Sequence, residues 1–304
     1  MTTAVTAQPA NIRIAPYKHN AQCAISYTFD DGMMEHYTLV APLFEELGWR
    51  ATFAINGRRI DRARWHQDTT TMTWDEVKQL HLRGHEIANH GWAHRKLTRI
   101  SPEEAQREIE RNDSAILVHT QAFPATFIYP FNAKDSLIIT MAEYRRVASR
   151  THQTAVGGKS SPEKLQRWVK QLLVRKAWGV GMTHGITYGY DAFDNYEQFK
   201  THLLAVQEMG PTVWVAPFGE VAKYLAHLQQ TTLTCQYSRK EWRIRLNTDL
   251  DAAQYNTPLT LLLENITFCP KVQQGRRKLA VFPMNGGYRV DIDPFGGEIR
   301  VSGQ

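Results

Sequence analysis

Short apolar segments alternate with helix-like segments between about residues 23 and 230, and this alternation restricts the fold more than any other feature. The apolar segments read as strands: CAISYTF, ATFAI, EIAN, ATFIY, RVAS, WGVGMT and TVWVA. Capping patterns open several of the helices between them, such as Thr73 with Glu76 and Ser101 with Glu104. Seven strand–helix steps of this kind predict a parallel sheet with helices outside it, in a closed or nearly closed βα barrel.

After about Gln230 the pattern changes to strand-like segments without a convincing helix. The NGG at 285–287 and the DPFGG at 293–297 are typical of hairpin turns. We therefore expect a βα domain over residues 1–230, able to fold alone, and a small antiparallel, sandwich-like β domain over 231–304.

The role of the β domain has two interpretations. A structural or oligomerisation role is favoured, and the latter would make the protein a homo-oligomer. Glycan binding is the alternative, because Trp242, Tyr255 and Tyr288 offer flat apolar faces that can stack on sugar rings.

Composition and charge exclude several classes of protein. Hydrophobic content of 42% and charged content of 22% are typical of soluble globular proteins. No apolar run approaches the ~18 residues of a membrane span, so none is expected. The net charge of +6 is scattered, and its densest cluster comprises Arg58, Arg59, Arg62 and Arg64. Without interleaved aromatic residues this cluster predicts a solvated face and no nucleic-acid partner, with a site for an anionic polymer as the alternative.

The cysteines and the amino terminus say little about the compartment. Cys23, Cys235 and Cys269 lack C-x-x-C spacing, which predicts neither a disulfide scaffold nor a thiolate zinc site. Cys23 lies in an apolar strand and is expected to be buried. MTTAVTAQPA has no charged or apolar region of a signal peptide, so the chain is either cytoplasmic or exported with its signal trimmed.

Two adjacent aspartates, Asp30 and Asp31, follow the first strand and precede a glycine. A turn would explain them, because Asp and Gly are ordinary turn residues. An active site would also explain them, if one carboxylate holds a cation and the other handles protons. In βα barrels the chemistry takes place at the carboxyl ends of the strands, where these aspartates are expected.

Two histidine pairs have the spacing i, i+4. His90 and His94 follow the EIAN strand, and on one helical turn both imidazoles would reach one metal ion. An aspartate with two histidines leaves positions open on the metal, as catalytic sites require. His81 and His85 have the same spacing, but Gly84 ends the helix between them, and we interpret that pair as structural.

Two further strand ends carry candidate residues. His184 ends the WGVGMT strand on the predicted active rim. The segment FIYPFN ends the fourth strand on that rim, where it could also simply close the mouth of the barrel.

Taken together, these segments resemble the NodB-type polysaccharide deacetylases, carbohydrate esterase family 4. TFDDG resembles the first motif of the family, HGWAH its H-x-x-x-H motif and MTH its last motif. The order and spacing over residues 23–230 also match, with ATFAING as the second strand. The resemblance implies an α/β fold, a distorted (βα)7 barrel, and a metal-dependent hydrolase that removes acetyl groups from an N-acetylated amino sugar or polysaccharide.

The resemblance also implies roles for individual residues. Asp30 would be the general base, and Asp31, His90 and His94 would be the ligands of Zn²⁺ (or Co²⁺ or Ni²⁺). His184 would be the general acid, and the backbone N–H of Phe131 would donate to the oxyanion. The cation would neutralise the second aspartate and leave the first free to act as a base.

The chain departs from the family at the third motif. An Arg that orients the basic Asp usually lies two residues before the Pro, and here that position is Ile128. We therefore expect either another basic residue near Asp30, with Arg150 and Arg175 as candidates, or a carboxyl pKa less depressed than in relatives.

The chain also departs from the family at the fourth motif, where an Asp and a Trp tune the catalytic His. No Asp occurs between Asp135 and Asp191, although Trp168 and Trp178 are available.

Three alternative functions stay open: an O-acetyl esterase on a glycan such as acetylxylan, a C–N hydrolase on a small amide, and a non-catalytic glycan-binding relative. A metal-free amide hydrolase should lack the histidine pair, which this chain keeps.

Overall fold

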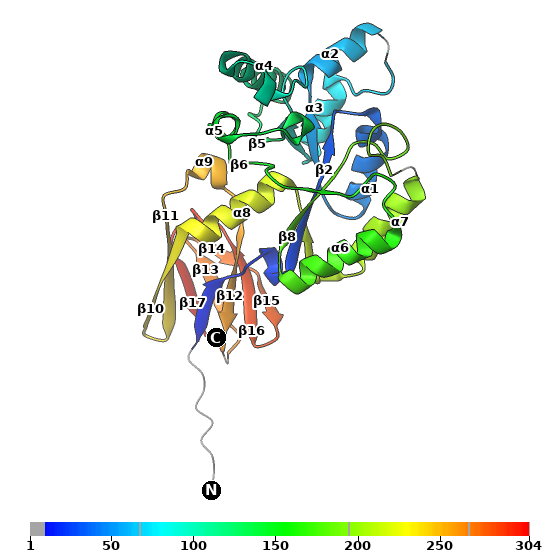
Figure 1. The fold of residues 1–304 in the computed structure, drawn as a ribbon. Helices are drawn as coiled ribbons and strands as arrows, with labels where there is room; N and C mark the ends of the chain where they lie inside the picture. Colours follow the sequence, from blue (N-terminus) through cyan, green and yellow to red (C-terminus); the bar gives the residue numbers. More distant parts are fainter. Residues whose placement is uncertain (1–9, 67, 194, 267, 304) are drawn as a thin grey trace. The chain divides into compact units, whose positions relative to one another are not determined.

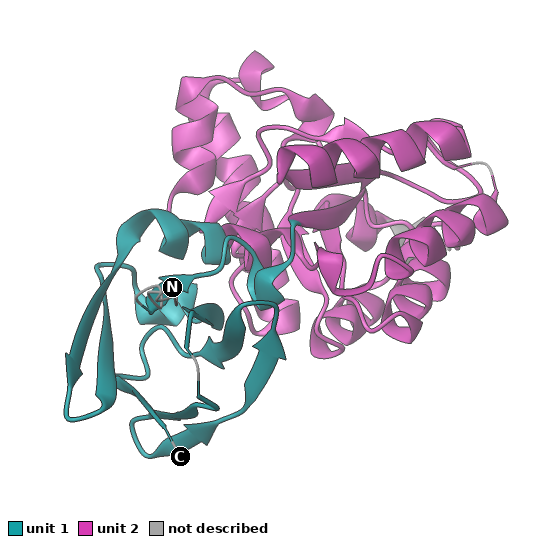
Figure 2. Cartoon of the chain, turned by 90° about the horizontal axis from the view of Figure 1, so that it is seen from below, with its two compact units in different colours: residues 1–22, 223–304 teal, residues 23–222 magenta. Residues whose placement is uncertain are grey.

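The computed structural model describes residues 10–303 apart from 67, 194 and 267, and describes no side chain of 63–66. The segment 1–9, where we expect no intact signal peptide, and the Arg64 side chain lie outside the described residues. The chain forms two compact units, one of residues 23–222 and one of residues 1–22 with 223–304 (Figure 2). None of the described helices is long and apolar enough to cross a membrane.

The unit of residues 23–222 is built on one eight-stranded sheet, in which every pairing is parallel. Along the sheet the order is β6-β5-β4-β3-β2-β8-β7, and β9 pairs with β2. The strands are β2 Cys23–Asp30, β3 Thr52–Ile55, β4 Glu86–Asn89, β5 Thr126–Phe127, β6 Ala148–Ser149, β7 Thr154–Ala155, β8 Trp178–Thr183 and β9 Val213–Val215. The predicted α/β fold is confirmed, and the short β7 is a strand beyond the seven predicted.

Strand β2 lies at the centre of this sheet, and all of its residues are buried. β8 follows one edge of β2 from Ala24 to Phe29. The other edge pairs first with β9, over Cys23 to Ile25, and then with β3, over Thr28 to Asp30. The sheet therefore curls around β2 as a half-barrel, with Asp30 at its carboxyl rim.

Helices flank the strands of this unit (Figure 1). The predicted capping boxes form: Thr73 with Glu76 begins α3, and Ser101 with Glu104 begins α4. A π-helical turn, His36–Val40, leads into α1. The helices are α1 Ala41–Glu46, α2 Gly57–His66, α3 Trp74–Leu82, α4 Pro102–Thr120, α5 Ser136–Glu143, α6 Pro162–Arg175, α7 Tyr196–Gln207 and α8 Phe218–Gln230, the last of which continues into the second unit.

The second unit contains two antiparallel sheets, as expected for the carboxyl-terminal region. One has the order β1-β12-β16-β15 and the other β10-β11-β17-β13-β14. Its described elements are β1 Asn11–Ile14, β10 Thr231–Ser238, β11 Glu241–Thr248, α9 Ala252–Tyr255, β12 Leu259–Glu264, β13 Lys271–Gln274, β14 Arg277–Leu279, β15 Val281–Met284, β16 Gly287–Ile292 and β17 Ile299–Ser302. Strand β1 comes from the amino-terminal end of the chain and pairs with β12.

One of the two predicted hairpin turns forms. Met284 pairs with Gly287 across the two-residue turn of the NGG segment. The hairpin predicted at 293–297 is wrong, because β16 and β17 on either side of it belong to different sheets. There the Gln274 side chain binds the first residue of the turn: its amide donates to the Asp293 carbonyl and its oxygen accepts from the Asp293 N–H.

Candidate active site

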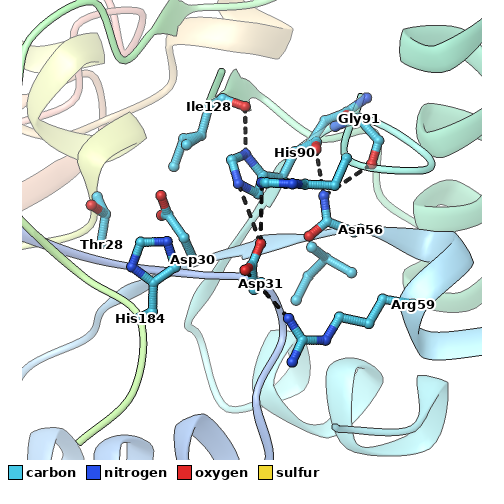
Figure 3. Close-up of polar contacts among 12 residues, drawn as sticks. Thr28, Asp30, Asp31, Asn56, Arg59, His90, Gly91, Ile128 and His184 are labelled. Atoms are coloured by element: carbon cyan, nitrogen blue, oxygen red, sulfur yellow. Dashed lines mark hydrogen bonds and ion pairs between the residues drawn. The ribbon is translucent and has the colours of Figure 1, made fainter. Parts of the chain in front are cut away.

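The carboxylates of Asp30 and Asp31 lie at the end of β2, and that of Asp31 faces His90 and Arg59 (Figure 3). Asp30 is the last residue of the strand and is only 3% exposed. Asp31 leaves the strand with a φ of 80°, a left-handed conformation that Asp tolerates better than most residues. Its N–H donates to the Ala54 carbonyl of β3. The change in backbone direction separates the two like charges.

The side chains of Asp31, His90 and His94 converge on one point. One ligand atom from each lies within 4.8 Å of the other two. The Asp31 Oδ1 is 3.6 Å from the His90 Nε2 and 3.4 Å from the His94 Nε2. The Asp31 Oδ1 and the His90 Nε2 are buried and have no hydrogen-bond partner. Burying two polar atoms in this way is unfavourable unless something binds them, so the cluster fits a divalent ion.

His90 is held in the tautomer that a metal ligand requires. Its Nδ1–H donates to the Ile128 carbonyl after β5, at 2.7 Å, which leaves the Nε2 lone pair toward Asp31. The Asn56 amide donates to the carbonyls of His90 and Gly91 and fixes the loop that carries the ring. A backbone acceptor on one ring nitrogen is the usual support of a metal-bound imidazole.

The two histidines meet without the helical turn that their spacing predicts. The helix expected for His90 and His94 is wrong, because this segment is a loop and His94 has a φ of 52°. Burial and the nearby His90 lower the pKa of His94, to about 4. The imidazole is therefore neutral near pH 7, as a metal ligand must be.

Arg150, which follows β6, lies against Asp30. Its Nη1 is 2.8 Å from Oδ1 and its Nη2 is 2.5 Å from Oδ2, so the pair is bidentate. The same Nη1 donates to the Thr28 hydroxyl. The expected basic residue is thus Arg150, whereas Arg175 is exposed at the end of α6.

The pair sets the charge of Asp30. Burial raises the pKa of its carboxyl, but Arg150, with smaller contributions from His90 and His184, lowers it to about 2. Asp30 is therefore ionised throughout the neutral range. Ile128, at the usual position of the family Arg, is fully buried with Ala54 and Ala88.

His184 directly follows β8, and its loop is braced by residues next to the aspartates. The His36 Nε2–H donates to the His184 carbonyl at 2.7 Å. The Glu35 carboxylate accepts from the N–H groups of Ile186 and Thr187 and from the Thr187 hydroxyl. Glu35 and His36, shortly after β2, therefore position the loop that follows the MTH motif. The sequence alone does not reveal this role.

Asp191 and Phe131 complete the surroundings. Burial raises the pKa of Asp191, and the charges of His184 and Lys164 oppose this shift. The Asp191 Oδ2 and the His184 Nδ1 are both buried without a hydrogen-bond partner. Phe131 has a φ of 57°, and its exposed ring packs on His94 at 4.5 Å between centroids. Asp191 therefore lies within electrostatic range of the histidine that lacks the family's usual Asp.

The fold and the cluster together define an α/β half-barrel protein with a candidate metal centre at its carboxyl rim. Residues 18–147 match the family model described as polysaccharide deacetylase. This match confirms the resemblance to the NodB-type polysaccharide deacetylases over residues 18–147.

The chain is similar to several solved structures. A peptidoglycan N-acetylglucosamine deacetylase is 15% identical with a TM-score of 0.50, over 67% of this chain and 89% of that chain. A family 4 acetyl xylan esterase from Clostridium thermocellum is 17% identical with a TM-score of 0.50, over 65% and 89%. A CE4 family pseudoenzyme from Bacillus anthracis is 14% identical with a TM-score of 0.49, over 67% and 66%. No curated protein matches the sequence.

Proposed function

We propose that the protein is a metal-dependent hydrolase that removes acetyl groups from an N-acetylated amino sugar or its polymer. The observation that carries this proposal is the convergence of Asp31, His90 and His94, with unpartnered ligand atoms, beside an ionised Asp30. Zn²⁺ is the ion we expect, with Co²⁺ and Ni²⁺ as alternatives, because one carboxylate and two imidazoles suit all three. When bound, the ion supplies Lewis-acid polarisation of the acetyl carbonyl.

The chain's own residues handle the protons and the developing charge. Asp30 accepts a proton from the water that attacks the acetyl carbon, while Arg150 holds its carboxylate in place. The backbone N–H of Phe131 donates to the oxyanion that forms. His184, protonated, then gives its proton to the leaving nitrogen as the C–N bond breaks. Acetate and a free amine are the products.

The Asp30–Arg150 pair favours catalysis over a non-catalytic glycan-binding role. A bidentate guanidinium on a buried carboxylate costs desolvation, and it is useful where an ionised base must be kept in one orientation. An O-acetyl esterase is the second candidate, because the same groups would serve an ester whose leaving group is an alcohol.

Separate Asn substitutions at the two aspartates test the assignment. Asp30→Asn should keep the bound zinc but lower the rate of acetate release by roughly 10²- to 10⁴-fold, the usual share of general acid–base catalysis. Asp31→Asn should weaken zinc binding, and excess zinc should partly restore its activity. Asp75→Asn, on the exposed start of α3, is the matched control. If both variants keep nearly full activity and zinc content, the two aspartates only form a turn. If Asp30→Asn loses zinc, Asp30 is the metal ligand and Asp31 is the general base.

A further inference from the structure

A cavity of about 460 Å³ adjoins the candidate metal centre, with Asp31 and His94 in its lining. Helix α2 contributes three arginines to this lining: Arg58, Arg59 and Arg62. Two carboxylates, those of Asp31 and Asp68, also line it, with Asn56 and Ala93. The lining therefore carries three positive and two negative side chains, before the charge of any bound ion is added.

Arg59 is already engaged within the site. Its Nη1 is 3.3 Å from the Asp31 Oδ2, on the side of the carboxylate away from the histidines (Figure 3). Its Nε donates to the Thr71 hydroxyl. Arg59 thus holds the proposed metal ligand Asp31 and is not free to bind a substrate.

Arg58 and Arg62 are different. Both are exposed, and neither side chain makes a hydrogen bond or ion pair with the described residues. They are four residues apart on α2 and therefore share a face, although like charges at this spacing slightly destabilise a helix.

The described carboxylates nearby form no ion pair with either of these arginines. Asp61 accepts from the Trp74 Nε1 instead. Asp68 accepts from the Thr70 N–H and from the hydroxyls of Thr70 and Thr71.

We propose that Arg58 and Arg62 form a subsite for an acidic group, a carboxylate or a phosphate, on the acetylated glycan. Guanidinium groups match both anions because their N–H donors form a planar fork. The subsite shares one cavity with the proposed metal ligands Asp31 and His94, so the acidic group lies on the acetylated sugar or on its neighbour. This inference rests on the proposed deacetylase function and narrows its substrate to acidic glycans.

Binding of small anions tests the subsite without relying on catalysis. Glucuronate, inorganic phosphate and, as a neutral control, glucose are titrated calorimetrically into the wild type and into the double variant Arg58→Gln/Arg62→Gln. Anion affinity should fall about tenfold in the double variant, because each exposed ion pair is worth a factor of roughly two to five. Any anion bound directly by the metal is common to both proteins, so their difference isolates the arginines. Arg167→Gln, on the exposed face of α6 outside this cavity, is the matched control and should bind as the wild type does.

The tighter of the two anions identifies the acidic group as a carboxylate or a phosphate. Equal affinities in the wild type and the double variant, or no saturable binding, would overturn the subsite. A second measurement compares acetate release from a hyaluronan tetrasaccharide, which alternates N-acetylglucosamine with glucuronate, and from neutral chitotetraose. The ratio of these rates should fall in the double variant and at high salt, which screens exposed charges. If neither glycan releases acetate while the arginines still bind anions, the deacetylase function fails and the subsite stands.

Discussion

The sequence identifies Arg150 as a candidate partner of Asp30 but does not predict its position in the fold. Arg150 is one of two candidates for a cation near Asp30, and only the pairing of the two-residue strand β6 with β5 brings it to the rim. Strands this short carry no periodicity from which a register can be predicted. The adjacent aspartates and the two histidines are easier to find, because each pair lies at or shortly after the end of an apolar strand.

Arg150→Gln should raise the pKa of Asp30, because the burial that opposes ionisation stays while the neighbouring positive charge is lost. The acid limb of the kcat/KM profile should then move to higher pH by about one unit or more.

In the wild type the ion pair between Arg150 and Asp30 stabilises the fold above the unfolded pKa of Asp30, ~3.9, and this contribution is lost as pH falls toward 2. In the variant the free energy of unfolding near pH 7 should fall by ~3–5 kcal/mol, the cost of leaving a buried charge unpaired. Arg150→Lys keeps the charge and should shift the limb less; an acid limb unchanged in both variants would separate Arg150 from the base.

Asp191→Asn tests whether this carboxylate assists His184. The two groups interact electrostatically, so the variant removes the anion beside the proposed general acid. We expect kcat to fall, with zinc content unchanged. A purely structural role for Asp191 would lower the melting temperature and leave kcat as in the wild type.

At the scale of elements, loops decide the geometry of the site. His90 and His94 meet in a loop that Asn56 fixes, although their spacing suggested a helical turn. The DPFGG segment has the turn residues of a hairpin but connects two sheets, because the same turn residues serve both kinds of connection. The local sequence therefore predicts the positions of turns but not which strands those turns connect.

Glu35→Ala should loosen the loop after β8, because the Ile186 and Thr187 amides would lose their acceptor. Each buried donor left unsatisfied costs ~1–3 kcal/mol, so the melting temperature should drop by several degrees. We expect kcat to fall about tenfold while zinc binding stays within twofold of the wild type. Equal losses in kcat and in zinc affinity would show that the loop supports the metal centre instead of His184.

At the scale of the whole chain, the βα unit contains the candidate site and its own core. The largest buried apolar cluster extends from Cys23 to Val215 and lies wholly within residues 23–222. The sequence pattern placed a boundary near residue 230, but it did not reveal that β1 pairs with β12. Pairing between strands so far apart in the chain leaves no local signal. In the second unit, Trp242 and Tyr288 lie in different sheets and Tyr255 lies on α9. Glycan binding by these three residues stays a prediction.

Residues 23–222 should fold and bind zinc when expressed alone, because the apolar core and the three proposed ligands are all retained. Circular dichroism with a cooperative thermal transition and a zinc titration would check this, with the full chain as the control. A fragment that is unfolded, or folded without zinc affinity, would mean that the second unit completes the core or the site.

Acetate release from chitotetraose and from a hyaluronan tetrasaccharide, measured with and without the metal, tests the proposed metal-dependent removal of acetyl groups. The full chain is assayed as purified, after treatment with a chelator, and after zinc is added back. We predict release of acetate with at least one glycan, loss of that activity in the chelated protein, and recovery on addition of about one zinc ion per Asp31–His90–His94 cluster. Acetate release that is unaffected by the chelator would show that no metal is needed, and no release from either glycan by the zinc-loaded protein would show that the protein is not a deacetylase of these sugars.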